Sequence, residues 1–219
     1  MEIQILNPSS RTDTGITKAI GQSLAWCRGP LMPAFRCLTL ADGPRGISTA
    51  ADSDRASPVV ARHIAEDETA SAYVVACFSD PGVFAARQLT DKPVIGIGEA
   101  GFAAAMMLGD QIGTISVSKG GAKKVKRQVR HLGLTMRHGG HRDLGLDYGD
   151  LQHHDLVNET LIRRVQEMVD EGVDVVLFAG AGLAQYAGNL QMKTSLPVVD
   201  PTQAAALVAL TQAMAQSKC

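Results

Sequence analysis

The stretch AYVVACFSDPG, residues 72–82, joins a continuous apolar run to a polar turn. Residues 73–77 show no alternation of polar and apolar side chains, which is typical of a strand covered on both faces by helices. Residues 80–82, DPG, are a strong turn signal. A second stretch, VVLFAGAGLA, residues 175–184, repeats the apolar run and ends in small residues. The two stretches therefore predict one buried parallel strand in each half of the chain.

Strand-like and helix-like segments alternate outward from these two stretches. Strands are expected at residues 2–6, 34–40, 73–77, 93–97, 111–118, 134–138, 173–178 and 196–199. Helices are expected at residues 14–26, 58–67, 83–89, 100–108, 122–132, 156–171, 183–192 and 202–214. Stretches rich in Gly and Asp predict loops at residues 42–54 and 139–149. The alternation predicts an α/β fold with parallel sheets.

The second half of the chain repeats the order of elements of the first. KPVIGIGEA, residues 92–100, corresponds in pattern to LPVVDPTQA, residues 196–204. We therefore expect two pseudo-symmetric lobes, each a short parallel sheet flanked by helices. The N-terminal lobe would comprise residues 1–97 and 203–219, and the C-terminal lobe residues 98–202. Ligands bind at the carboxyl ends of parallel strands, which places the site in the cleft between the strands of Val74 and Val175.

The amino-acid composition argues against two classes of binding partner. Of the 219 residues 45% are hydrophobic and 20% charged, with a formal net charge of −1, so neither nucleic acid nor an anionic membrane is an expected partner. No apolar run approaches the roughly 20 residues of a membrane span, and residues 1–8 read as a strand, not a signal peptide. The cysteines lack the spacing of a metal site or a disulfide framework. We expect a cytoplasmic protein.

Five motifs along the chain resemble the aspartate/glutamate racemase superfamily, and most of all its hydantoin and allantoin racemases. In chain order they are LNPS at residues 6–9, GP at 43–44, ACFSDPG at 76–82, PVIGIGEA at 93–100 and AG at 181–182. The resemblance implies two α/β lobes with the active site between them, and an enzyme that uses no cofactor or metal. It also implies two catalytic cysteines, one from each lobe, on opposite faces of a carbon acid.

Thiols suit the inversion of a stereocentre, which needs an acid and a base on opposite faces of a planar carbanion. The ordinary pKa of a thiol, about 8.5, lies near working pH. Amide N–H groups at the end of a strand can favour the thiolate, so we expect the pKa of Cys77 to be lowered. The same amides can hold charge that develops on a carbonyl or carboxylate.

One position departs from the superfamily pattern. The resemblance places the second cysteine directly before AG in the second lobe, and this chain has Gly180 there. Cys27, Cys37 and Cys219 fall on a predicted helix, strand and tail, and cannot replace it. Cys77 would then act alone. Arylmalonate decarboxylases of the same superfamily also carry one thiol, in the other lobe, which implies that the scaffold supports one-thiol chemistry.

The candidate site follows from these motifs. Cys77 is the catalytic candidate, although a cysteine at the end of a strand is also a common core residue. The substrate-binding candidates lie at strand ends or in the turns after them: Asn7, Phe78, Ser79, Ser116, Gly180, Ala181 and Gly182. The expected partner is a small molecule, and we expect a homo-oligomer.

Three other patterns compete with this assignment. GIGEAG at residues 96–101 fits GxGxxG, but it follows the fourth strand and lacks the acidic residue of a dinucleotide site. The basic segment 118–127 lacks the Walker spacing and reads as a solvated helix face. Five histidines lie within residues 131–154; they could be surface residues, metal ligands, or a replacement for the missing acid–base group.

These observations leave several functions open. The first is a cofactor-independent enzyme acting on a small cyclic ureide such as a hydantoin, or on a related carboxylate, through Cys77. With one thiol the reaction could be a one-face protonation, as in decarboxylation or isomerisation. It could also be nucleophilic attack on a hydantoin or thiohydantoin ring, with hydrolysis or desulfuration. The alternatives to catalysis by Cys77 are a descendant that only binds such a ligand, and a dinucleotide-dependent oxidoreductase.

Overall fold

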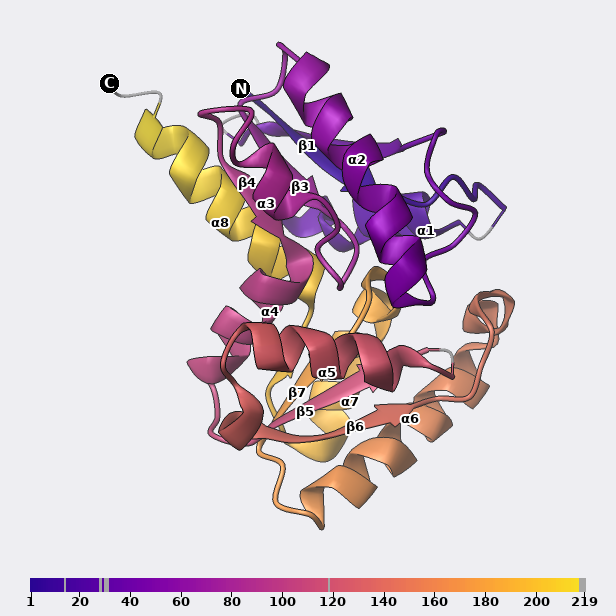
Figure 1. Ribbon diagram of the computed structural model, residues 1–219. Helices are drawn as coiled ribbons and strands as arrows, with labels where there is room; N and C mark the ends of the chain where they lie inside the picture. Colours follow the sequence, from indigo (N-terminus) through magenta and orange to yellow (C-terminus); the bar gives the residue numbers. More distant parts are fainter. Residues whose placement is uncertain (14, 28, 30–31, 118, 217–219) are drawn as a thin grey trace.

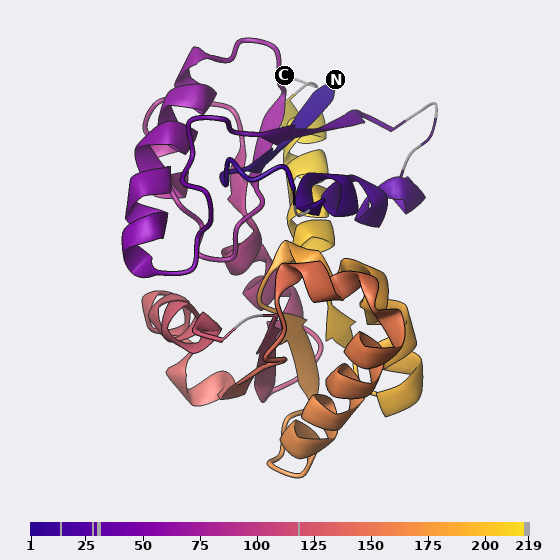
Figure 2. The ribbon, with the colours of Figure 1, turned by 90° about the vertical axis from the view of Figure 1, so that its right-hand side faces the viewer.

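The computed structural model describes residues 1–13, 15–27, 29, 32–117 and 119–216. Two four-stranded parallel sheets form two lobes, one above the other in Figures 1 and 2. The strands are β1 (Glu2–Asn7), β2 (Ala34–Thr39), β3 (Ala72–Val75), β4 (Val94–Gly96), β5 (Ile112–Ser116), β6 (His138–Asp143), β7 (Val175–Phe178) and β8 (Val198–Val199). The helices are α1 (Ile16–Ser23), α2 (Ala50–Glu66), α3 (Val83–Ala86), α4 (Ile97–Met106), α5 (Gly121–His131), α6 (His154–Val169), α7 (Ala187–Thr194) and α8 (Pro201–Gln216).

The strand order of the second sheet repeats that of the first. The first sheet runs β2-β1-β3-β4 and the second β6-β5-β7-β8, and every pairing is parallel. In each sheet the strand that begins the lobe lies in the middle, between the second and third strands along the chain. The expected α/β fold of two similar parallel-sheet lobes is confirmed.

Helices cover both faces of each sheet, which explains the continuous apolar runs of the central strands. In β3, Val74 packs with α1 and α8 on one face, whereas Tyr73 and Val75 pack with α2 and α3 on the other. In β7, Val176 and Phe178 pack with α6 and α7 on one face. Its remaining residues pack with α4 and α5 on the other face. Successive side chains of a strand point to opposite faces, so both sets must be apolar.

The last helix of each half packs against the other half. Phe102 and Ala105 of α4 lie in one cluster with Val175 and Leu177 of β7. The helix α8 returns to the first lobe, where its alanines pack with residues of β1 and β3, and Figure 1 shows it beside that sheet. The packing of α4 against the second lobe and of α8 against the first lobe holds the two lobes together. No helix among the described residues is long and apolar enough to cross a membrane.

The predicted loops at residues 42–54 and 139–149 were wrong in part, and the predicted strand at residues 134–138 was wrong apart from its last residue. Residues 138–143, HGGHRD, form the edge strand β6, while residues 135–137 of the expected strand form a 3-10 turn, η2 (Thr135–Arg137). Parallel pairing with β5 holds β6 despite its polar sequence. The helix α2 begins at Ala50, not near Pro58, because Thr49 and Asp52 form a reciprocal capping box. The remaining 3-10 turns are η1 (Ala25–Cys27), η3 (Tyr148–Gln152) and η4 (Ala181–Tyr186).

Candidate active site

A cavity of about 450 Å³ lies between the lobes, at the carboxyl ends of β1, β3 and β7. Its position agrees with the rule that ligands bind beyond the carboxyl ends of parallel strands. Both lobes contribute the lining residues, which are Asn7, Ser9, Arg11, Ile16, Gly46, Ile47, Ser48, Ala76, Cys77, Phe78, Lys124, Asp147, Gly149, Ala179, Gly180, Ala181 and Gly182. Six of the eight candidate site residues are among them; Ser79 and Ser116 are not.

Cys77 follows β3 and lies half-buried at the cavity wall. Its Sγ lies 3.4 Å from the Oγ of Ser79, and the backbone N–H of Ser79 also donates to the sulfur. The N–H of Asp80 donates to the carbonyl of Cys77 at 2.9 Å, which closes the turn. Ser79 thus contacts the thiol rather than the cavity. Cys27, by contrast, is buried in the core of the first lobe, and Cys219 lies outside the described residues.

The pKa of Cys77 is raised, which corrects the expectation of a lowered value. Burial disfavours the thiolate and dominates the shift. The positive charge of Lys124 and the two hydrogen bonds from Ser79 act in the opposite direction, and the carboxyl of Asp80 adds to the rise. The site therefore holds a mostly protonated thiol, with a cation and two donors ready to support the thiolate once it forms.

Asp80 fixes the turn that carries Cys77. Its backbone is left-handed, with a φ of 48°, and its buried carboxyl accepts from the N–H groups of Gly98 and Glu99, both at 2.8 Å. It also accepts from the Nε2 of Gln128 in α5 at 2.6 Å, a hydrogen bond between the two lobes. Burial raises the pKa of Asp80 to about 8, although the N–H groups of Gly98 and Glu99 favour the charged form. Asp80 thereby ties the thiol turn to both α4 and the second lobe.

The glycines of the GxGxxG pattern serve this packing. A Cβ on Gly96 would lie 2.3 Å from the carboxyl carbon of Asp80, and one on Gly98 would lie 2.3 Å from the carbonyl oxygen of Phe78. A Cβ on Gly101 would press on side chains of the second lobe. The close approach of α4 to the thiol turn therefore explains the pattern without a bound dinucleotide.

Gly180 lines the cavity from the second lobe, beyond the end of β7. Its φ of 164° and ψ of 159° are extended values that any residue adopts. A Cβ built there has no heavy atom within 4 Å, apart from its chain neighbours. Neither the backbone nor steric crowding requires glycine at this position. Gly180 therefore leaves open space at the cavity wall where a side chain would fit.

Asn7 ends β1, and this buried residue lines the cavity. Its Nδ2 donates to the Oγ1 of Thr17 at 2.9 Å, and its Oδ1 accepts from the N–H of Ser9 at 3.1 Å. The hydroxyls of Thr17 and Thr39 share a further hydrogen bond of 2.6 Å. Asn7 therefore holds the loop after β1 in place and forms part of the wall.

Ser116 belongs to a polar network in the second sheet. Its Oγ lies 3.1 Å from the Nε2 of His141, and the Nδ1 of that ring lies 3.0 Å from the Oγ1 of Thr114. The Nε2 of His138 lies 3.0 Å from the same threonine oxygen. Burial is the main cause that lowers the pKa of His141 to about 4, so the ring is neutral at neutral pH. Neither histidine lines the cavity.

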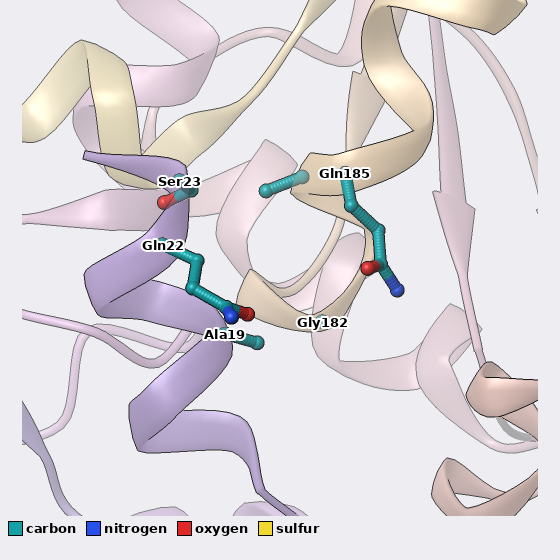
Figure 3. A pocket seen from close by; sticks show the side chains of 6 residues that line it. Ala19, Gln22, Ser23, Gly182 and Gln185 are labelled. Carbon is teal, nitrogen blue, oxygen red and sulfur yellow. The ribbon is translucent and has the colours of Figure 1, made fainter. Parts of the chain in front are cut away.

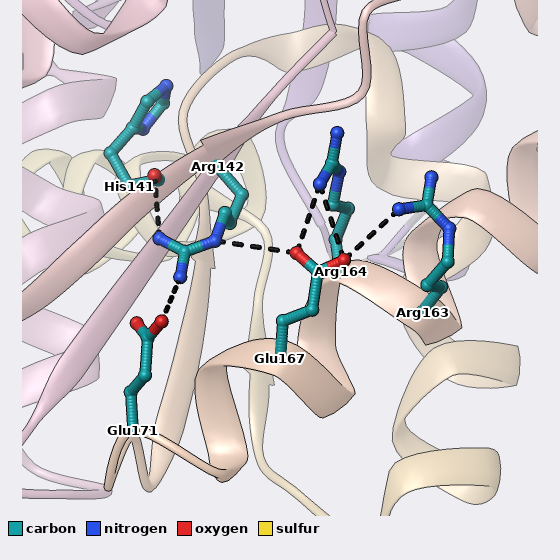
Figure 4. Close-up of polar contacts among 6 residues, drawn as sticks. All are labelled: His141, Arg142, Arg163, Arg164, Glu167 and Glu171. Carbon is teal, nitrogen blue, oxygen red and sulfur yellow. Dashed lines mark hydrogen bonds and ion pairs between the residues drawn. The ribbon is translucent and has the colours of Figure 1, made fainter.

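The other polar residues of this region have structural partners. Arg142 of β6 forms ion pairs with Glu167 of α6 and with Glu171 in the turn after that helix, and these pairs fasten the edge strand to the end of α6 (Figure 4). The Nδ1 of His154 lies 3.0 Å from the hydroxyl of Tyr186. Within the described ranges no three His, Cys, Asp or Glu side chains are grouped as metal ligands.

A smaller cavity of about 100 Å³ lies between α1 and η4. Figure 3 shows Gln22 of α1 and Gln185 of η4 on its two sides. Gly182 lines both this space and the large cavity. The turn after β7 therefore separates the two spaces.

Sequence reasoning missed three charged residues of the large cavity: Arg11, Lys124 and Asp147. Arg11 follows the LNPS motif, and Asp147 lies in the second lobe before η3. The sequence pattern places Lys124 on a solvated basic face. No sequence signal distinguishes it from the other lysines of α5, because its position depends on how that helix meets the first lobe.

Comparisons with known proteins agree with this geometry. The family described as Asp/Glu/Hydantoin racemase matches residues 3–209. A hydantoin racemase of Paenarthrobacter aurescens is 29% identical over 216 residues, covering 95% of this chain and 89% of its own. A second, from Pseudomonas sp. (strain NS671), is 27% identical over 204 residues, covering 91% of this chain and 81% of its own. The allantoin racemase structure from Klebsiella pneumoniae superposes with a TM-score of 0.89 at 23% identity, covering 99% of this chain and 89% of its own.

Proposed function

This chain belongs to the Asp/Glu/hydantoin racemase family, and on that premise we propose that it is a cofactor-independent enzyme acting through the single thiol of Cys77. The proposed substrate is a small cyclic ureide of the hydantoin class, or a related carboxylate. The hydantoin racemases similar to this chain support the ring class. A cavity of about 450 Å³ is of the size that small-molecule sites have.

One observation carries the proposal: Cys77 and Gly180 line the same cavity from different lobes. The thiolate of Cys77 would remove the proton from the carbon between the ring carbonyl and the ring nitrogen. The electron pair would spread onto the carbonyl oxygen, where backbone N–H groups near Phe78 and Ala181 would hold the charge. Gly180 offers no acid on the far face, so the proton would return from Cys77 to the face it left.

A one-thiol site therefore predicts exchange without inversion. We would incubate an enantiopure 5-substituted hydantoin with the enzyme in deuterium oxide, and measure deuterium at C5 and optical rotation in parallel. The expected result is deuterium incorporation with retained configuration, at least about tenfold faster than inversion. A sample without enzyme corrects for spontaneous exchange. Rapid enzymatic inversion would contradict the one-thiol mechanism.

A second candidate reaction is nucleophilic attack by Cys77 on a ring carbon, followed by hydrolysis. The open space beside Gly180 favours it, because a water or a bulky substituent fits there. Attack by the thiolate on a ring carbonyl would form a C–S bond and break the C–N bond of that carbonyl, with the leaving nitrogen taking a proton from water. A second water would then cleave the acyl-enzyme and restore the thiol. Mass spectrometry of the enzyme during turnover separates the two reactions. A covalent adduct on Cys77 supports attack, and unmodified protein with a deuterated ring supports proton transfer.

A further inference from the structure

Lys124 differs from the other basic residues of α5. That helix carries five of them: Lys123, Lys124, Lys126, Arg127 and Arg130. Four are exposed, as a solvated face requires, whereas Lys124 is half-buried and lines the cavity. Its positive charge also lowers the pKa of Cys77, so it lies within electrostatic reach of the thiol. Lys124 therefore brings a charge from the second lobe to a thiol of the first lobe.

The ammonium group of Lys124 has an incomplete set of partners. Its Nζ donates to the carbonyl oxygen of Ile47 at 2.7 Å, across the boundary between the lobes. The part of the chain that the structure describes contains no ion pair to it. An ammonium has three N–H donors. One hydrogen bond to a neutral carbonyl therefore leaves two donors, and the positive charge, for a ligand to satisfy.

Arg11, the other cation of the cavity, is already paired. Its guanidinium contacts the carboxylate of Asp13 through two hydrogen bonds of 3.1 Å. Asp147 is the carboxylate among the lining residues. The remaining lining residues are small, polar or apolar and carry no charge. Within this cavity, Lys124 is thus the cation best placed to receive a negative group from a ligand.

We propose that Lys124 determines specificity by binding a carboxylate of the substrate, so that the preferred substrates carry an acidic group beside the carbon that faces Cys77. The inference rests on the proposed function and narrows its substrate class to hydantoins with an acidic side chain, or to ring-free dicarboxylates. A charge-assisted hydrogen bond between an ammonium and a carboxylate is strong in a partly desolvated site. It would also hold the substrate between the two lobes, in register with the thiol.

The test compares ligands of equal size that differ in charge. Cys77→Ser protein, in which we expect turnover to be lost, would be titrated with hydantoin-5-acetate and with its neutral amide by calorimetry. We expect the acid to bind about 10-fold to 100-fold more tightly than the amide. Adding Lys124→Gln to this variant should remove the preference for the acid. The affinity for the amide should stay within about twofold of its value with Lys124 present. Lys123→Gln, on the exposed side of the same helix, is the matched control and should leave the preference intact.

Three outcomes would overturn the inference. The acid and the amide could bind equally well in the presence of Lys124. Lys124→Gln could weaken both equally, which would mark Lys124 as a structural residue. Lys123→Gln could abolish the preference as effectively, which would indicate a general field effect. Thermal unfolding tests whether each variant is folded. If Cys77→Ser is not folded, Cys77→Ala takes its place in the titrations.

A second ligand pair separates the failure of this inference from the failure of the proposed function. Succinamate and its neutral amide, succinamide, carry the same charge contrast without a ureide ring. Lys124-dependent preference for succinamate over succinamide, with no binding of either hydantoin, would uphold the role of Lys124 and reject the ring class. Binding of both hydantoins with no dependence on Lys124 would support the ring class and reject the role of Lys124.

Discussion

Cys77 in the first lobe and Gly180 in the second line one cavity from corresponding strand ends. Cys77 follows β3 and Gly180 follows β7, and these strands hold the same place in the two sheets. At these two corresponding positions, one lobe therefore carries a thiol side chain and the other carries only the hydrogen atom of a glycine. A site with this asymmetry can treat the two faces of a planar intermediate differently.

Gly180→Cys should fold and add a second thiol to the cavity. The backbone there is extended and a Cβ meets no neighbouring atom, so we expect the free energy of unfolding to change by less than about 1 kcal/mol. An acid on the far face would allow protonation there, so inversion of an enantiopure hydantoin should appear or accelerate. Chiral chromatography of the product measures it.

Gly180→Ser is the matched control for this variant. It has nearly the same shape but a hydroxyl too weakly acidic to exchange a proton at this rate. Inversion by Gly180→Ser as fast as by Gly180→Cys would show that the added group acts by shape alone. A large loss of stability in both would show that the space beside Gly180 is smaller than it is in the structure.

Alkylation of Cys77 by iodoacetamide should accelerate strongly with pH. Burial raises the pKa of this thiol above its ordinary value, so the thiolate fraction should still be increasing beyond that value. Ser79→Ala and Lys124→Gln each remove a group that favours the thiolate, and each should move the midpoint to higher pH. Peptide mass spectrometry across a pH series provides the rates. A midpoint below the ordinary thiol value would contradict the raised pKa.

Strands buried on both faces were predictable from sequence, and the edge strand was not. Val74 and Val176 lie in apolar runs whose two faces must both be covered, and this pattern identified the central strands. β6 has polar or small residues throughout, and long-range pairing with β5 and the ion pairs of Arg142 stabilise it. Neither interaction leaves a local signal. The start of α2, by contrast, does have a local signal, the capping box of Thr49 and Asp52.

The candidate site likewise contains residues that were predictable from sequence and one, Lys124, that was not. Asn7, Cys77 and Gly180 follow parallel strands, so the end of each strand indicated its position at the cavity. Lys124 reaches the cavity only because α5 packs across the boundary between the lobes, where its Nζ contacts Ile47. A contact between residues so distant in the chain depends on tertiary packing alone.

Gly98→Ala should destabilise the protein and disturb the thiol turn. The new Cβ would lie 2.3 Å from the carbonyl oxygen of Phe78, a backbone atom that cannot move without moving Cys77. Overpacking of this kind costs about 1–3 kcal/mol. Gly188→Ala in α7 is the control, because its Cβ meets no atom within 4 Å and alanine favours a helix. Urea unfolding compares the two, and equal stability would contradict the close approach of α4.

Stability should fall with acid in a way that depends on His141. Its pKa is lowered to about 4 in the folded protein, whereas an unfolded histidine protonates near 6.5. The unfolded state therefore binds more protons between these values, and stability is lost as pH decreases from about 6.5 to about 4. The full effect is on the order of 3 kcal/mol. His141→Gln should flatten this dependence, and His153→Gln, at an exposed site, should preserve it.

Urea unfolding at several pH values measures the slope for each protein. An acid dependence in His141→Gln as steep as in the unmodified protein would assign the effect to other groups. A shallow dependence in His153→Gln would likewise show that the effect does not belong to the network of Thr114, Ser116 and His141.

The most direct test of the role of Cys77 is turnover by the Cys77→Ser variant. A serine hydroxyl has a similar size but stays protonated where a thiol ionises, so the variant should fold, bind the ligand and lose nearly all activity. Deuterium exchange at C5 of a hydantoin, relative to the unmodified protein, is the measurement. We expect a loss far greater than tenfold. Activity within about tenfold, roughly 1.4 kcal/mol of barrier, would contradict it and show that Cys77 does not carry the reaction.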